Sequence, residues 1–71
     1  MQAKPGQRYY YSDKYYDESI LELVEPVKAY GEERWKVKVI KMKKFLTGKI
    51  LNNWTMSYGS WIYMEGQDAP I

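Results

Sequence analysis

The clearest alternation of apolar and polar positions in this 71-residue chain lies between residues 34 and 41. Three apolar residues alternate there with three basic ones: Trp35, Val37 and Val39 with Arg34, Lys36 and Lys38. A period of two is typical of a strand with one buried face. We therefore predict a strand over 34–41 with its three apolar side chains buried together. The alternation breaks at Ile40-Lys41-Met42, which predicts a bulge or the end of the strand.

Four other segments are rich in β-branched and aromatic residues and predict short strands, over residues 7–11, 20–25, 49–51 and 61–64. Pro26 should end the second of them, because proline cannot donate to a sheet ladder. Residues 27–33 then form a hairpin loop, Gly48 a turn, and residues 52–59 an irregular segment with at most one helical turn.

A helix is the rival interpretation for the segment that begins at Ser12 or Asp17 and runs to Val24. We disfavour it because tyrosine is only a middling helix former and short isolated helices are marginal. Pro26 and Gly31 would also cut such a helix short. The sequence therefore predicts an all-β fold: a single domain over residues 1–71, with an ordered core over about 5–64 and a loose tail over 65–71.

Five short strands in so few residues favour a small, strongly bent, five-stranded barrel of the SH3-like type over an OB-like one, which usually needs more length. The layout resembles the SH3-like barrels that include Tudor, KOW and many short phage proteins. Four features carry this resemblance: Pro5-Gly6-Gln7-x-Tyr9, the hairpin around Gly31, Trp35-x-Val37-x-Val39, and Trp61-Ile62-Tyr63. The acidic and paired-Trp pattern of peptide-binding SH3 domains is missing, so the resemblance does not imply proline-rich ligands. The many Lys and Tyr residues fit an AT-rich phage genome.

Composition argues against catalysis, because the chain has no cysteine and no histidine. The best nucleophile and the commonest general base are missing, and no disulfide can form. Adjacent acids such as Glu32-Glu33 point to opposite faces of a strand. We expect a protein that is not an enzyme and needs no cofactor and no metal. No apolar run approaches the ~20 residues that span a bilayer, and no signal peptide is recognisable, so we expect a cytoplasmic protein with no membrane contact.

Tyrosine is the most unusual local feature, with five residues in one strand-turn-strand stretch: Tyr9, Tyr10, Tyr11, Tyr15 and Tyr16. So small a domain cannot bury all five rings, and exposed tyrosines suit protein interfaces. The candidate partner-binding residues are Tyr10, Tyr16, Tyr15 and Tyr11. The favoured function is a small binding protein that acts through a protein–protein interface, as a phage-type inhibitor or accessory factor would. Self-association into a homo-oligomer is another use of the same surface, and closure of the barrel ends is the purely structural interpretation.

The alternative function is nucleic-acid binding, because seven of the eleven basic residues lie between residues 34 and 49. The candidate phosphate-binding residues are Arg34, Lys36, Lys38, Lys43 and Lys44. Phosphate contact is one use of such a stripe, and protection of an exposed strand against aggregation is the other. The net charge of only +2 favours the protein partner. An aromatic cage for methylated lysine is a third hypothesis.

Overall fold

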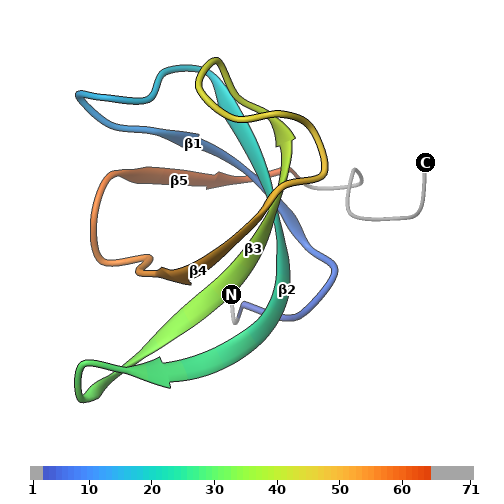
Figure 1. Cartoon of the computed structure of the whole chain (residues 1–71). Coiled ribbons are helices and arrows are strands. Elements are labelled where there is room, and N and C mark those ends of the chain that lie inside the picture. The colour runs from blue at the N-terminus through green and yellow to red at the C-terminus, as the bar shows by residue number, and fades with distance from the viewer. Residues whose placement is uncertain (1–2, 65–71) are drawn as a thin grey trace.

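The computed structural model describes residues 3–64 and contains five strands: β1 (Arg8–Ser12), β2 (Ser19–Ala29), β3 (Glu32–Lys41), β4 (Ile50–Trp54) and β5 (Ser60–Tyr63). They form one antiparallel sheet in the order β4-β3-β2-β1-β5 (Figure 1). The predicted all-β class with five strands is confirmed. β4 and β5 are the two edges of this sheet, and the predicted tail over 65–71 lies outside the described residues.

The strongest predicted strand, over 34–41, corresponds to β3, which begins two residues earlier and ends at the same residue. Val37 and Val39 are fully buried, as expected, and Lys38 between them is exposed. Trp35 is only half-buried, because it lies opposite Pro26, where the β2–β3 hairpin leaves the rest of the sheet. The predicted irregularity at residue 40 is also present: Ile40 is an extra residue between the pairs Ile20–Lys41 and Leu21–Val39.

Pro26 does not end β2, which continues to Ala29, so this prediction is wrong. The ladder with β1 ends at Glu22, and the last backbone bonds on that side join Leu23 to Gln7 and Gly6. Pro26 lies beyond them on an open edge, where a missing N–H costs no ladder bond. The β2–β3 hairpin therefore reaches past the other strands (Figure 1).

The predicted hairpin loop over 27–33 is much shorter in the structure, with only Tyr30 and Gly31 between the strands. Both have positive φ, 54° and 76°, the pattern of a type I′ turn. This turn matches the twist of the flanking strands, so the pairing extends to Ala29–Glu32. Tyr30 is an unusual residue for this conformation, and its ring packs 4.9 Å from the Arg34 guanidinium.

The core is built from alternate residues of the four strands β1 to β4 and from Met42 after β3. Its buried members are Tyr9, Tyr11, Leu21, Leu23, Val37, Val39, Met42 and Leu51. Half-buried aromatic residues pack against it: Tyr16, Trp35, Phe45, Trp54, Trp61 and Tyr63. The sheet bends enough for Tyr11 on β1 to lie 5.0 Å, ring centre to ring centre, from Trp54 on edge strand β4. This bend gives the sheet a concave, aromatic face.

Candidate binding site

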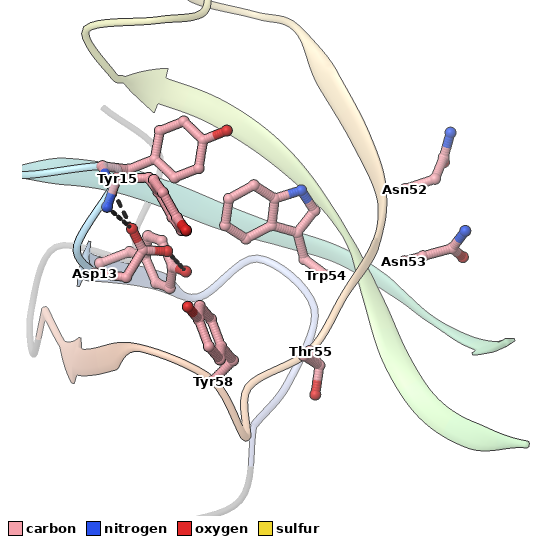
Figure 2. Close-up of a pocket in the computed structure, with 9 residues that line it drawn as sticks. Asp13, Tyr15, Asn52, Asn53, Trp54, Thr55 and Tyr58 are labelled. Carbon is pink, nitrogen blue, oxygen red and sulfur yellow. Dashed lines mark hydrogen bonds between the residues drawn. The ribbon is translucent and has the colours of Figure 1, made fainter. Parts of the chain in front are cut away.

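A pocket of about 250 Å³ opens beside the concave face, between the loop after β1 and the end of β4 (Figure 2). Its lining is mainly aromatic: Tyr11, Asp13, Tyr15, Tyr16, Asn52, Asn53, Trp54, Thr55 and Tyr58. Figure 2 shows Trp54 and Tyr58 turned toward Asp13, whereas the amides of Asn52 and Asn53 point away. The inner wall is therefore made of ring surface, a single carboxylate and phenolic hydroxyls.

Asp13 shapes the wall that carries Tyr15 and Tyr16. Its Oδ1 accepts hydrogen bonds from the backbone N–H groups of Tyr15 and Tyr16, both at 2.7 Å, and its own N–H donates to the Tyr16 carbonyl at 2.8 Å. An aspartate that accepts from residues two and three positions later is a common turn device. The turn sets the Tyr16 ring 5.9 Å from Trp54 and 6.1 Å from Phe45. Asp13 thus joins the loop to the core.

The second oxygen of Asp13 accepts a hydrogen bond from the Tyr11 hydroxyl. Burial, this hydrogen bond and the negative charge of Asp13 raise the pKa of Tyr11 far above its ordinary value. Partial burial raises the pKa of Asp13, but the hydrogen bonds from Tyr11, Tyr15 and Tyr16 and the charge of Lys14 together lower it below its ordinary 3.8. At neutral pH the pocket therefore holds a neutral Tyr11 donor and an ionised Asp13.

The opposite wall is positioned by the β4–β5 connection. The Trp61 indole N–H donates to the Tyr58 carbonyl at 2.9 Å, and the hydroxyls of Thr55 and Ser57 lie 2.8 Å apart. Gly59 follows with a φ of 76° and lies directly against the Tyr11 ring. The close approach of this glycine brings the turn that carries Tyr58 onto the buried Tyr11.

The structure divides the four predicted partner-binding tyrosines between two places. Tyr15 is exposed and Tyr16 half-buried, and both line the pocket. Tyr11 also lines it, although this residue is only 2% exposed, because residue alternation places it with Tyr9 in the core. Tyr10 points to the other side of β1, where it lies between Ile20 and Ile62 of the neighbouring strands.

The predicted basic stripe is only partly paired with acids. Lys36 pairs with Glu25 at 3.1 Å, Lys38 stands opposite Glu22 in the ladder, and Arg34 pairs with Glu32. Arg34 also donates to the Asn53 carbonyl at 3.1 Å and is half-buried. The remaining two residues, Lys43 and Lys44, are exposed in the loop after β3. The five basic residues therefore do not form one free cationic face.

Sequence reasoning missed six of the residues that line the pocket: Asp13, Asn52, Asn53, Trp54, Thr55 and Tyr58. One signal was available, because Asp13 followed by Lys14 and two tyrosines is a turn sequence directly after a strand. Trp54 and Tyr58 gave no such signal. Their place beside Asp13 depends on the bend of the whole sheet.

No protein-family model, curated protein or solved structure matches this chain. Residues 3–64 include no group of three or more acidic side chains placed to hold a metal ion. The described part of the chain also contains no helix long and apolar enough to cross a membrane.

Asp13 should make folding stability depend on pH in the acid range. Its carboxyl has a lower pKa in the folded chain than the ordinary 3.8, so its contribution is complete above that pH and is lost as the pH falls through the lower, folded value. Urea unfolding of the wild type and Asp13→Asn between pH 2 and pH 6 measures this contribution. We expect the free-energy gap between them to be constant at the upper end and to shrink below pH 3.8.

Asp17→Asn is the matched control, because Asp17 is exposed in the same loop and uses its backbone carbonyl, not its carboxylate, to accept a hydrogen bond from Ser19. The difference in unfolding free energy between Asp17→Asn and the wild type should change less with pH than the difference for Asp13→Asn. A gap for Asp13→Asn that stays constant down to pH 2 would contradict the role given to the carboxylate.

Proposed function

We propose that this chain is a non-enzymatic binding protein that engages a protein partner through the aromatic pocket. The observation that carries the proposal is the pocket itself: rings from Tyr15, Tyr16, Trp54 and Tyr58 surround one ionised carboxylate. Large, half-exposed rings supply contact area at low entropic cost and are frequent anchors of protein interfaces. A role as an inhibitor or accessory factor of a larger protein suits a domain of this size.

The same proposal includes an SH3-like barrel as the fold. Its support is the strand order, in which β1 to β4 follow one another through hairpins and β5 returns to pair with β1. The contact between Tyr11 and Trp54 adds to it, since it brings β1 and β4 together across the concave side. In such a fold the loop after β1 and the β4–β5 turn would lie at one end of the barrel, where the pocket is.

The distribution of charge favours a protein over a nucleic acid as partner. The residues that line the pocket include no lysine and no arginine, and their one charged group is an anion. Phosphate binding requires free basic groups, but Arg34 and Lys36 already have carboxylate partners. A polyanion would therefore find a carboxylate inside the pocket, and two of the four basic residues of β3 already paired with acids.

Matched tyrosine variants test the proposal. Tyr58 and Tyr10 are both 49% exposed, but only Tyr58 lines the pocket. In a pull-down from host lysate treated with nuclease, we expect the wild type and Tyr10→Ser to retain the same protein, and Tyr58→Ser and Tyr15→Ser to lose it. With the purified partner, each pocket variant should weaken binding by more than about 1 kcal/mol.

Circular dichroism of each variant checks that the fold persists, because surface substitutions usually change stability by only about 0.5 kcal/mol. Loss of the partner in Tyr10→Ser alone would place the interface on the opposite face of β1. Retention that disappears after nuclease treatment would favour the nucleic-acid function. A sedimenting dimer that dissociates in Tyr58→Ser would identify the partner as a second copy of the chain.

A further inference from the structure

The loop between β3 and β4 carries positive charge that has no ion-pair partner. Residues 41–49 contain no acid and four lysines, Lys41, Lys43, Lys44 and Lys49, all of them exposed. Within residues 3–64, the ion pairs use other basic residues. The segment therefore presents a local charge of +4 to its surroundings.

This loop has a defined conformation, because its far end is tied back to β3. The Gly48 N–H donates a hydrogen bond to the Val39 carbonyl at 2.7 Å, and the Thr47 hydroxyl donates to the Ile40 carbonyl at 3.2 Å. The Phe45 ring is half-buried against the core. The fold therefore sets the direction of the side chain that follows Phe45.

That side chain is Leu46, which is 84% exposed. A single exposed leucine is ordinary on a protein surface. Leu46, however, lies between two lysines that extend over neighbouring rings. The Lys44 Nζ is 5.7 Å from the centre of the Tyr16 ring, and the Lys49 Nζ is 5.9 Å from the centre of the Phe45 ring. The loop thus presents an apolar tip surrounded by cations.

The type of cation indicates the class of partner for this loop. All of its basic residues are lysines, and lysine is depleted in protein interfaces whereas arginine is enriched. A lysine ammonium is a point charge on a flexible stem, without the planar fork that matches one fixed carboxylate or phosphate. Four such groups suit a surface of many interchangeable anions, which a membrane and a nucleic acid both provide.

Leu46 favours the membrane. Proteins that bind single strands stack bases on open aromatic faces, but Lys44 and Lys49 already lie over the rings beside Leu46. A leucine wedge in a duplex must unstack bases, at a cost that a large wrapped surface offsets. One short loop offers no such surface. An anionic bilayer accepts an apolar side chain at the boundary between head groups and acyl chains.

We propose that the loop over residues 41–49 adsorbs to an anionic lipid surface, with Leu46 inserted among the head groups and the four lysines against their phosphates and carboxylates. Lysine stems cover apolar surface at such an interface while the ammonium groups stay in water. The expectation of no membrane contact rests on the lack of an apolar span, which bears on crossing a bilayer and not on adsorption. The inference goes beyond the proposed function, because the loop does not line the pocket.

The loop after β1 lies beside this segment and modifies its charge. The Tyr16 ring of that loop is 6.1 Å from the Phe45 ring, and Figure 1 shows the two loops next to each other. Lys14 adds a cation there, whereas Asp17 and Glu18, both exposed, oppose the attraction to an anionic surface. Asp17→Asn should therefore strengthen lipid binding, and weaker binding of this variant would contradict the proposal.

Co-sedimentation of the whole chain with vesicles tests the proposal. The vesicles contain phosphatidylcholine alone, or phosphatidylcholine with phosphatidylserine as about one lipid in three. We expect binding to the anionic vesicles only, weakened at least ten-fold when the salt rises from about 0.02 M to about 0.15 M, because salt screens exposed charges. Absence of binding to the anionic vesicles would overturn the proposal, and so would equal binding to both kinds.

Matched lysine variants locate the contact. Lys43→Gln and Lys44→Gln should each weaken vesicle binding by about five-fold, the effect of one lysine near an anionic membrane. Lys28→Gln is the control, because Lys28 is exposed in the β2–β3 hairpin at the other end of β3. Equal losses in Lys28→Gln and Lys44→Gln would mean that the overall charge acts and that the loop is no specific site.

Leu46→Ser tests the apolar tip without a change of charge and should weaken vesicle binding at least three-fold. Ile62→Ser is its control, because Ile62 is 61% exposed on β5. Circular dichroism checks that each variant is folded. Unchanged vesicle binding by Leu46→Ser would overturn the insertion. An oligonucleotide that displaces the chain from anionic vesicles, and that Leu46→Ser binds as tightly as the wild type does, would replace the lipid with a nucleic acid.

Discussion

Leu21→Ala is expected to remove a large share of the free energy of unfolding and to lower the urea midpoint strongly. Leu21 is fully buried on the central strand β2, between Tyr9 of β1 and Val39 of β3. Truncation of a buried leucine costs about 2–5 kcal/mol through lost transfer energy and the cavity left behind. The stability of a domain of this length is on the order of 4–10 kcal/mol, so one such change removes a large share of it.

Leu46→Ala is the matched control, because the same atoms are removed from a side chain that is 84% exposed in the loop after β3. Its effect should stay within about 0.5 kcal/mol. Urea unfolding followed by tryptophan fluorescence measures both variants. Equal midpoints for Leu21→Ala and the wild type would show that the core is not organised around β2.

The sequence predicted most reliably what depends on local pattern. The alternation around Val37 and Val39 placed β3 and its buried face correctly, because both faces of that strand have uniform surroundings over several residues. Trp35 follows the same alternation but is only half-buried, since its neighbours are the protruding hairpin and edge strand β4. The alternation along a strand predicts which face of the sheet a side chain lies on. How deeply that side chain is buried depends on the elements that cover this face.

The errors have a different cause. The prediction that Pro26 ends its strand fails because a proline is tolerated where one side of the strand has no partner, and the sequence does not show where β1 stops. In the same way, no local pattern indicates that Trp54 and Tyr58 meet Asp13, more than forty residues earlier in the chain. The pocket is a consequence of sheet curvature, and curvature is set by bulges such as the one at Ile40.

Gly59 links the bend of the sheet to the pocket. We expect Gly59→Ala to damage both the fold and the pocket. A Cβ there would lie 2.7 Å from Cε1 and 2.9 Å from the hydroxyl of Tyr11, and 3.0 Å from the Ser12 carbonyl oxygen. The φ of 76° adds backbone strain for any residue with a side chain. The strain costs on the order of 1–3 kcal/mol, and overpacking against the buried ring adds about 1–3 kcal/mol more.

Gly48→Ala separates the cost of backbone strain from the cost of overpacking. Gly48 has a φ of 93°, but a Cβ at that position would meet nothing within 4 Å. It should therefore show the backbone strain alone, whereas Gly59→Ala should lose clearly more stability in the same urea titration. Equal losses would mean that the turn moves aside without cost, and that the contact between Gly59 and Tyr11 does not hold the β4–β5 connection in place.

Gly59→Ala should also alter the pocket, because Tyr11 contacts Gly59 and donates a hydrogen bond to Asp13. If the added methyl displaces the Tyr11 hydroxyl, Asp13 loses one of the hydrogen bonds that lower the pKa of its carboxyl. The Asp13 carboxyl signal followed by NMR between pH 2 and pH 6 should then titrate at a higher pH in Gly59→Ala than in the wild type. An unchanged titration in a folded Gly59→Ala protein would show that the buried ring and the carboxylate are positioned independently.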